Sequence, residues 1–120
     1  MSKLSLAVQY ASSAKHMPTR QQFRRWVKAA MQHDLQITLR IVDENEGRYL
    51  NKSFRGKDYA TNVLTFVYDE ELPVYGDLII CAPVVAKEAR KQHKQLEEHF
   101  AHLTIHAVLH LQGYEHEAED

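Results

Sequence analysis

The chain has 120 residues, of which 44% are apolar, and this size and composition predict a single domain with its own hydrophobic core. Cys81 is the only cysteine, so a disulfide bond within the chain is excluded. No segment is long and apolar enough to cross a bilayer, and the first ten residues lack the apolar run of a secretory signal, so we expect a cytoplasmic protein without a membrane partner.

The net charge of −1 hides two halves of opposite sign. Residues 1–57 contain eleven Lys or Arg and four Asp or Glu, whereas residues 58–120 contain four and twelve. A basic half can hold phosphate groups while an acidic half surrounds a cation. The same split also arises without function in small domains, so the charge distribution alone does not identify a ligand.

The first half of the chain predicts two strands and two helices. Apolar residues alternate over Leu4–Tyr10 and again over Leu35–Ile41, as in half-buried strands. Thr19–Gln22 has the capping-box pattern, and apolar residues follow it at helical spacing. The outer face of this helix is basic and carries Arg20, Arg24, Arg25 and Lys28. Asp43–Glu46 predicts a second helix start, and Gly56 is the expected stop.

The second half predicts two strands followed by two helices. We expect a short strand at Val63–Phe66, an acidic loop over Val67–Tyr75 and a buried central strand at Leu78–Cys81. Pro83 is expected at the first position of a helix that runs to about Lys94, and a last helix covers roughly Leu96–Gln112. The order βαβαββαα implies an α+β domain with a small mixed sheet packed with helices.

Three histidines near the end of the chain predict a metal site. His106 and His110 are four residues apart, on one face of the last helix. Gly113 can end that helix in the left-handed conformation, so the chain can return His116 towards the first two. Three imidazoles without a fourth protein ligand form an open site for one Zn²⁺ ion, at which water becomes acidic enough for hydrolysis.

Simpler readings of these histidines remain open. Two histidines at helical spacing more often point into solvent or have their hydrogen bonds satisfied in the core. The third histidine, which follows a glycine, is the feature that favours a metal. His99 and His102 lie on the same helical face. They either orient the metal ligands, contact phosphate, or are ordinary polar positions near the helix start. Ala107 stands where zinc peptidases carry their general base, Glu, which argues against proteolysis.

A second dense region spans residues 50–66 and contains several cations. Gly56-Lys57 is not a phosphate loop, because Asn51 stands where that motif requires a glycine. Arg55 and Lys57 can still bind phosphate directly, and the planar guanidinium of Arg55 offers two donors to two oxygens.

Together these segments resemble the bacterial YbeY family. The resemblance is carried by Arg55-Gly56-Lys57-Asp58, Thr61-Asn62-Val63-Leu64, Gly76-Asp77-Leu78-Ile79-Ile80-Cys81 and the three-histidine segment, in the same order over nearly the whole chain. It implies a zinc-dependent endoribonuclease specific for single-stranded RNA. It also implies a role in maturing the 3′ end of small-subunit ribosomal RNA and in ribosome quality control, with the ribosome or its assembly factors as partners.

The resemblance also implies site residues within one YbeY-like metallohydrolase domain spanning residues 1–120. His106, His110 and His116 would be the zinc ligands, and Arg55 the functional arginine of the substrate cleft. We further expect Lys52, Lys57 and Asn62 to contact the RNA, with the basic helix face also available to its backbone. The nucleophile is either a zinc-activated water or the RNA's own 2′-hydroxyl group.

Three features of the sequence depart from the family pattern. Ala107 replaces the usual glycine after the first ligand, and Val67 replaces the proline that follows the third strand. Most members continue past the third histidine into another helix, whereas only four residues follow His116 here. Two other functions stay open: a zinc-dependent hydrolase of another substrate such as a peptide, which the histidine pair on the helix favours, and a non-catalytic ribosome-assembly factor with a structural zinc.

Overall fold

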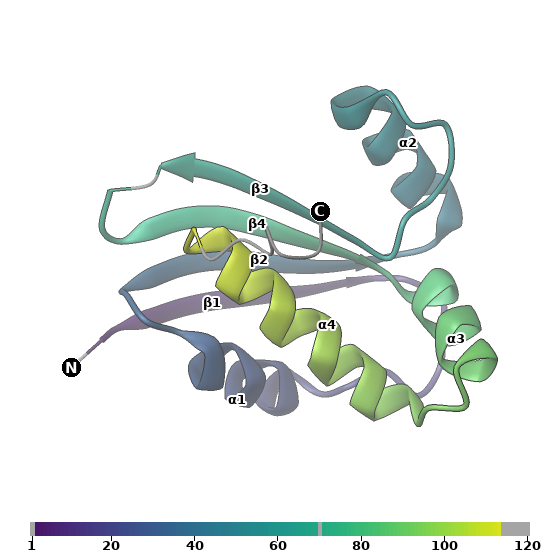
Figure 1. The fold of residues 1–120 in the computed structure, drawn as a ribbon, viewed down its shortest axis with the longest axis horizontal. Coiled ribbons are helices and arrows are strands. Elements are labelled where there is room, and N and C mark those ends of the chain that lie inside the picture. The colour runs from purple at the N-terminus through teal and green to yellow at the C-terminus, as the bar shows by residue number, and fades with distance from the viewer. Residues whose placement is uncertain (1, 70, 114–120) are drawn as a thin grey trace.

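The computed structural model describes residues 2–69 and 71–113 (Figure 1). The chain forms the predicted order of elements, and the fold is α+β. Their bounds are β1 Leu4–Ala11, α1 Arg20–Ala30, β2 Leu35–Val42, α2 Glu44–Arg55, β3 Val63–Asp69, β4 Val74–Cys81, α3 Ala82–Lys91 and α4 Leu96–Leu111. No helix among these is long and apolar enough to cross a membrane.

The four strands form one mixed sheet in the order β1-β2-β4-β3. β1, β2 and β4 run parallel, and β3 runs antiparallel to β4 at the edge. The prediction of a central strand at Leu78–Cys81 is confirmed. The predicted acidic loop over Val67–Tyr75 was too long, because β3 continues to Asp69 and β4 begins at Val74. The hairpin pairs Asp69 with Tyr75, and the rings of Tyr68 and Tyr75 pack with centroids 5.3 Å apart. Such cross-strand packing outweighs the polar composition.

The two helix starts in the first half use different chemistry. At α1 the capping box is confirmed, since Gln22 N donates to Thr19 Oγ1 at 3.1 Å and Thr19 N donates to Gln22 Oε1 at 2.9 Å. At α2 the carboxylate of Asp43 does not cap the helix. It accepts hydrogen bonds from Ser12 and Ser13, which hold the pKa of Asp43 below its ordinary value and tie the end of β1 to α2.

The ends of the helices differ slightly from prediction. Gly56 ends α2 in the left-handed conformation with φ 72°, as expected. Pro83 is the second residue of α3, because the helix begins one residue earlier at Ala82. That helix ends at Lys91 instead of Lys94, since His93 adopts a left-handed φ of 56° that helix geometry does not allow.

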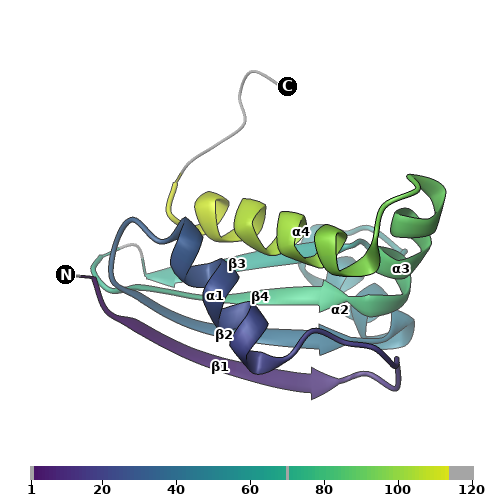
Figure 2. The same ribbon diagram turned by 90° about the horizontal axis from the view of Figure 1, so that it is seen from below.

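The two faces of the sheet are covered unequally. Helices α1 and α4 pack side by side on one face (Figure 2), where Phe23 and Phe100 meet edge to face with ring centroids 6.2 Å apart. The other face is met by α2 and carries a smaller buried cluster that consists of Val42, Leu64, Ile79 and Cys81. Cys81 is 1% exposed, and burial raises the pKa of its thiol. The main core therefore lies between the sheet and α1 and α4.

Candidate active site

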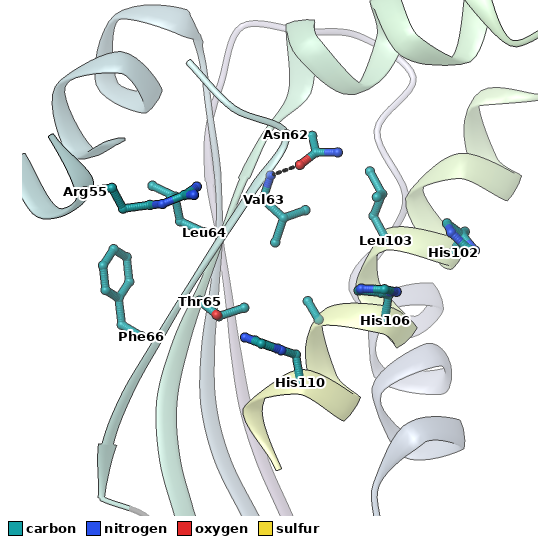
Figure 3. A pocket seen from close by; sticks show the side chains of 11 residues that line it. Arg55, Asn62, Val63, Leu64, Thr65, Phe66, His102, Leu103, His106 and His110 are labelled. Carbon is teal, nitrogen blue, oxygen red and sulfur yellow. Dashed lines mark hydrogen bonds between the residues drawn. The ribbon is translucent and has the colours of Figure 1, made fainter. Parts of the chain in front are cut away.

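A pocket of about 500 Å³ lies between the edge strand β3 and helix α4. Residues 62–66 of β3 and its approach form one wall, the C-terminal half of α4 forms the other, and Arg55 reaches in from the end of α2 (Figure 3). The lining residues are Arg55, Asn62, Val63, Leu64, Thr65, Phe66, His102, Leu103, His106, Ala107 and His110. The end of α2, the start of β3 and the C-terminal half of α4 thus meet at one edge of the sheet.

His106 and His110 both line this pocket, one helical turn apart, as their spacing predicts. His106 is half-buried and His110 is exposed. The ring of His102 lies one turn earlier, with its centroid 6.1 Å from that of His106. His116 falls outside the described residues, so the third predicted ligand is not placed. Within residues 2–69 and 71–113, no group of three or more His, Cys, Asp or Glu side chains is arranged to hold a metal ion.

His99, on the same face of α4, has a different environment. It is 3% exposed, and its Nε2 lies 2.9 Å from Oε1 of Glu88 on α3. The same carboxylate accepts hydrogen bonds from Nδ2 of Asn62 at 3.1 and 3.3 Å. Glu88 therefore joins α4 to the residue that leads into β3, and His99 belongs to the packed interior and does not line the pocket.

Asn62 lines the pocket, but its amide already has partners within the protein. Besides the bond to Glu88, its Oδ1 accepts a hydrogen bond from Val63 N at 2.6 Å. Its backbone carbonyl accepts another from Cys81 N at 2.9 Å, at the end of β4. These bonds anchor the start of the edge strand, and contact of Asn62 with RNA stays a prediction.

Unlike Arg48 and Lys52 on the same helix, Arg55 has no carboxylate partner among the described residues. Arg48, two turns earlier on α2, binds Asp58 through two hydrogen bonds of 2.7 and 3.1 Å. Lys52 lies 4.0 Å from the same carboxylate. Lys57 is exposed, and neither lysine lines the pocket. Of these four cations, only Arg55 lines the pocket.

The basic face of α1 lies away from this site. In Figure 1, α4 separates α1 from β3, so α1 lies on the opposite side of α4 from the pocket. Arg20 of this face is engaged locally, with its guanidinium 4.9 Å from the ring centroid of Tyr10. The face remains available as a distant surface but contributes nothing to the pocket walls.

Several pocket residues escaped sequence analysis. Thr65 and Phe66 of β3 and Leu103 of α4 line the pocket, and nothing in a short strand of ambiguous pattern shows which helix it will face. Phe54, just before Arg55, packs its ring against Phe66 with centroids 4.9 Å apart and remains 65% exposed. Helical spacing places Phe54 on the same stripe as the buried Gly47 and Asn51, so nothing in the sequence indicated its exposure.

The sequence matches the protein family described as Endoribonuclease YbeY over residues 7–120. The chain belongs to this family. The Endoribonuclease YbeY of Methylobacillus flagellatus is 57% identical over 119 residues, which cover 99% of this chain and 80% of that protein. The Endoribonuclease YbeY of Thiobacillus denitrificans is 58% identical over 116 residues, covering 95% and 79% of the two chains.

A solved structure supports the fold of this YbeY family member. The solution structure of TM1509 from Thermotoga maritima is 31% identical to this chain, covers 94% of it and 77% of that chain, and aligns with a TM-score of 0.63. The resemblance drawn from the arginine, asparagine and histidine segments is therefore confirmed at the level of the family, and the α+β fold is shared with a solved protein.

Proposed function

We propose that this protein is a zinc-dependent endoribonuclease that cuts single-stranded RNA in the pocket between β3 and α4. One observation carries the proposal: the unpaired guanidinium of Arg55 and the imidazoles of His106 and His110 line the same pocket from opposite sides of β3 (Figure 3). The relatives named as endoribonucleases support the reaction class. The proposed substrate is the 3′ end of small-subunit ribosomal RNA, in keeping with the family resemblance, and a part in ribosome quality control belongs to the same proposal.

The residues present fit a zinc ion. His106 and His110 offer imidazole nitrogens from adjacent turns of a helix, and nitrogen donors suit zinc better than magnesium or calcium, which prefer oxygen. His116 is proposed as the third ligand. When bound, zinc supplies a Lewis acid for a phosphate oxygen and lowers the pKa of a water molecule.

Arg55 is proposed to act on the phosphate. Its planar guanidinium can donate two parallel hydrogen bonds to two phosphate oxygens and so fix the orientation of the phosphodiester. Its charge also stabilises the negative charge that develops in the transition state. The apolar side chains of Val63 and Leu103 in the pocket walls lower the local dielectric constant, which strengthens this attraction.

The remaining predicted contacts have supporting roles in this proposal. Lys52 and Lys57 lie on the Arg55 side of the site and are proposed to hold the RNA backbone as it leaves the pocket. Asn62 is proposed to set the position of the β3 wall, because its amide is bonded to Glu88 and Val63. The substrate implies a cytoplasmic enzyme that works with the ribosome or its assembly factors, as one metallohydrolase domain.

The first test compares RNA cleavage by matched variants. We expect zinc-loaded protein to cut an unstructured RNA, and we expect His110→Ala or chelation to abolish cleavage. Arg55→Ala should lower kcat about 100- to 1,000-fold, as removal of a transition-state donor does, while its zinc content stays unchanged. Arg48→Ala, on the same helix but outside the pocket, should cut normally. Full activity of Arg55→Ala would remove Arg55 from the mechanism.

The same preparation separates the competing functions. A 2′,3′-cyclic phosphate at the product end would assign the attack to the RNA's 2′-hydroxyl group, and its absence would favour water. Degradation of an unstructured protein without cleavage of RNA would favour the peptide hydrolase. Loss of the fold on zinc removal, together with no cleavage of RNA, would favour an assembly factor with a structural zinc.

A further inference from the structure

The side of the pocket that carries Arg55 also carries two aromatic rings. Phe54 lies in the last turn of α2 and Phe66 lies on β3, with ring centroids 4.9 Å apart and an angle of 64° between the planes. Phe66 lines the pocket, whereas Phe54 is 65% exposed. A single exposed apolar side chain is ordinary on a protein surface. The ring of Phe54, however, packs against Phe66, which forms part of the pocket wall.

The end of α2 places a cation beside these rings. Gly56 ends the helix directly after Arg55, which is exposed like Phe54. Figure 3 shows the ring of Phe66 and the side chain of Arg55 on the same side of β3. The helix end therefore presents an exposed aromatic ring and an exposed guanidinium without a carboxylate partner on one side of β3.

This pairing matches the chemistry of single-stranded RNA, in which a charged phosphate and a flat base recur at every nucleotide. Proteins that bind single strands combine cations for the backbone with aromatic rings on which bases stack. We infer that Phe54 and Phe66 form a stacking subsite for the base adjacent to the phosphate held by Arg55. The inference deepens the proposed function and rests on it. Because every base has an aromatic face, this subsite tolerates any base.

A second aromatic pair on the same hairpin is a poorer candidate. The rings of Tyr68 and Tyr75 lie 5.3 Å apart, but the hydroxyl of Tyr68 donates to Asp77 at 2.7 Å. The negative carboxylate beside these rings repels phosphate. The charge beside each pair therefore favours Phe54 and Phe66, next to Arg55, as the site where a nucleotide binds.

The test measures binding separately from cleavage. A short single-stranded DNA serves as the probe, since it carries phosphates and bases but lacks the 2′-hydroxyl groups of the proposed substrate. We expect Phe54→Ala in the zinc-loaded protein to weaken its binding roughly 5- to 100-fold, the loss typical of one stacked base. Phe54→Trp should retain binding. Tyr49→Ala is the matched control, because Tyr49 lies on the same helix, is 68% exposed and does not line the pocket, and it should bind normally.

On cleavable RNA, Phe54→Ala should raise KM and leave kcat nearly unchanged. The inference is overturned if Phe54→Ala binds the probe as tightly as the unmodified protein, if Tyr49→Ala loses as much, or if folded protein does not bind the probe at all. Cleavage of RNA with unaffected binding by Phe54→Ala would overturn the subsite and leave the proposed function intact. Binding that depends on Phe54, without cleavage of RNA, would support the subsite and overturn the proposed function.

Discussion

The two faces of the sheet have opposite characters. On the face under α1 and α4, large side chains such as Phe23 and Phe100 are almost completely buried. On the face met by α2, the buried cluster is small, and Phe54, Tyr68 and Tyr75 remain 65%, 59% and 43% exposed. The first face supplies most of the hydrophobic stabilisation, which scales with the apolar area removed from water.

The pocket lies at the edge strand where these two faces meet. Its histidines come from α4, which packs on the large hydrophobic core. Its arginine comes from α2, which covers the face with the small buried cluster. A well-packed helix is a rigid support for metal ligands, and a lightly covered surface leaves cations and rings free for a ligand. The following predictions test this division, from the largest expected effect to the smallest.

The same substitution on the two faces should have very different effects. Phe100→Ala removes a ring that is 1% exposed and should lower the free energy of unfolding by about 3–5 kcal/mol. Phe54→Ala removes a ring that is 65% exposed and should cost less than about 1 kcal/mol. Urea denaturation followed by circular dichroism measures both values. Equal losses would show that the division between the faces is wrong.

Glu88→Ala should weaken the junction between α4 and the edge strand. The substitution leaves Nε2 of the buried His99 without its partner and frees the amide of Asn62, which should cost about 1–3 kcal/mol. Glu88→Gln keeps hydrogen-bonding groups in place and should lose less. If both variants unfold at the same urea concentration as the unmodified protein, this junction does not contribute to stability.

Two glycines offer a matched pair, one for each face. A Cβ on Gly76 would lie 2.5 Å from the carbonyl oxygen of Phe66 and 2.9 Å from Cδ2 of Leu111 on α4, so Gly76→Ala should destabilise the protein by about 1–3 kcal/mol. A Cβ on Gly47 in α2 would meet Cys81 Sγ at 3.1 Å. Gly47→Ala should have the smaller effect, because alanine also favours the helix. Thermal denaturation of both variants ranks them, and the opposite order would contradict this packing.

The exposed tyrosine pair gives the smallest effect. Its hydrogen bond to Asp77 raises the pKa of Tyr68 from an ordinary 10 to about 12. Because the folded-state pKa is the higher one, this bond stabilises the fold fully below pH 10, and its contribution is lost as the pH rises towards 12. Asp77→Asn should return the titration of Tyr68 towards pH 10, as measured by ultraviolet absorbance. An unchanged titration would exclude Asp77 as the cause.

The sequence predicted the elements well where its pattern was regular. Alternation at β1 and β2 and the capping box at Thr19 gave the order of elements and one correct helix start, because these signals depend on neighbouring residues alone. The strand ends at Asp69 and Val74 were missed because hairpin pairing and the Tyr68–Tyr75 contact are made across the sheet. Local composition at these positions is acidic and indicated a loop.

The sequence predicted which histidines share a helical face, but not the environment of each one. Helical spacing placed His106 and His110 on one face, and the structure puts both in the pocket. The same spacing included His99, whose partner Glu88 comes from another helix, so the sequence could not separate an interior histidine from a pocket histidine. Likewise, pairing of Arg48 but not Arg55 depends on where Asp58 folds back.

Cys81 can serve as a chemical reporter of opening on the face of the sheet that α2 covers. It is the only cysteine of the chain, it lies in the cluster on the α2 side, and burial raises the pKa of its thiol. An exposed thiolate attacks thiol reagents, so Cys81 does not react with them while the cluster stays buried. The rate at which such a reagent labels Cys81 therefore measures how often local opening exposes this cluster. A change in that rate when RNA is added would report a change in the mobility of the side of the protein that carries Arg55.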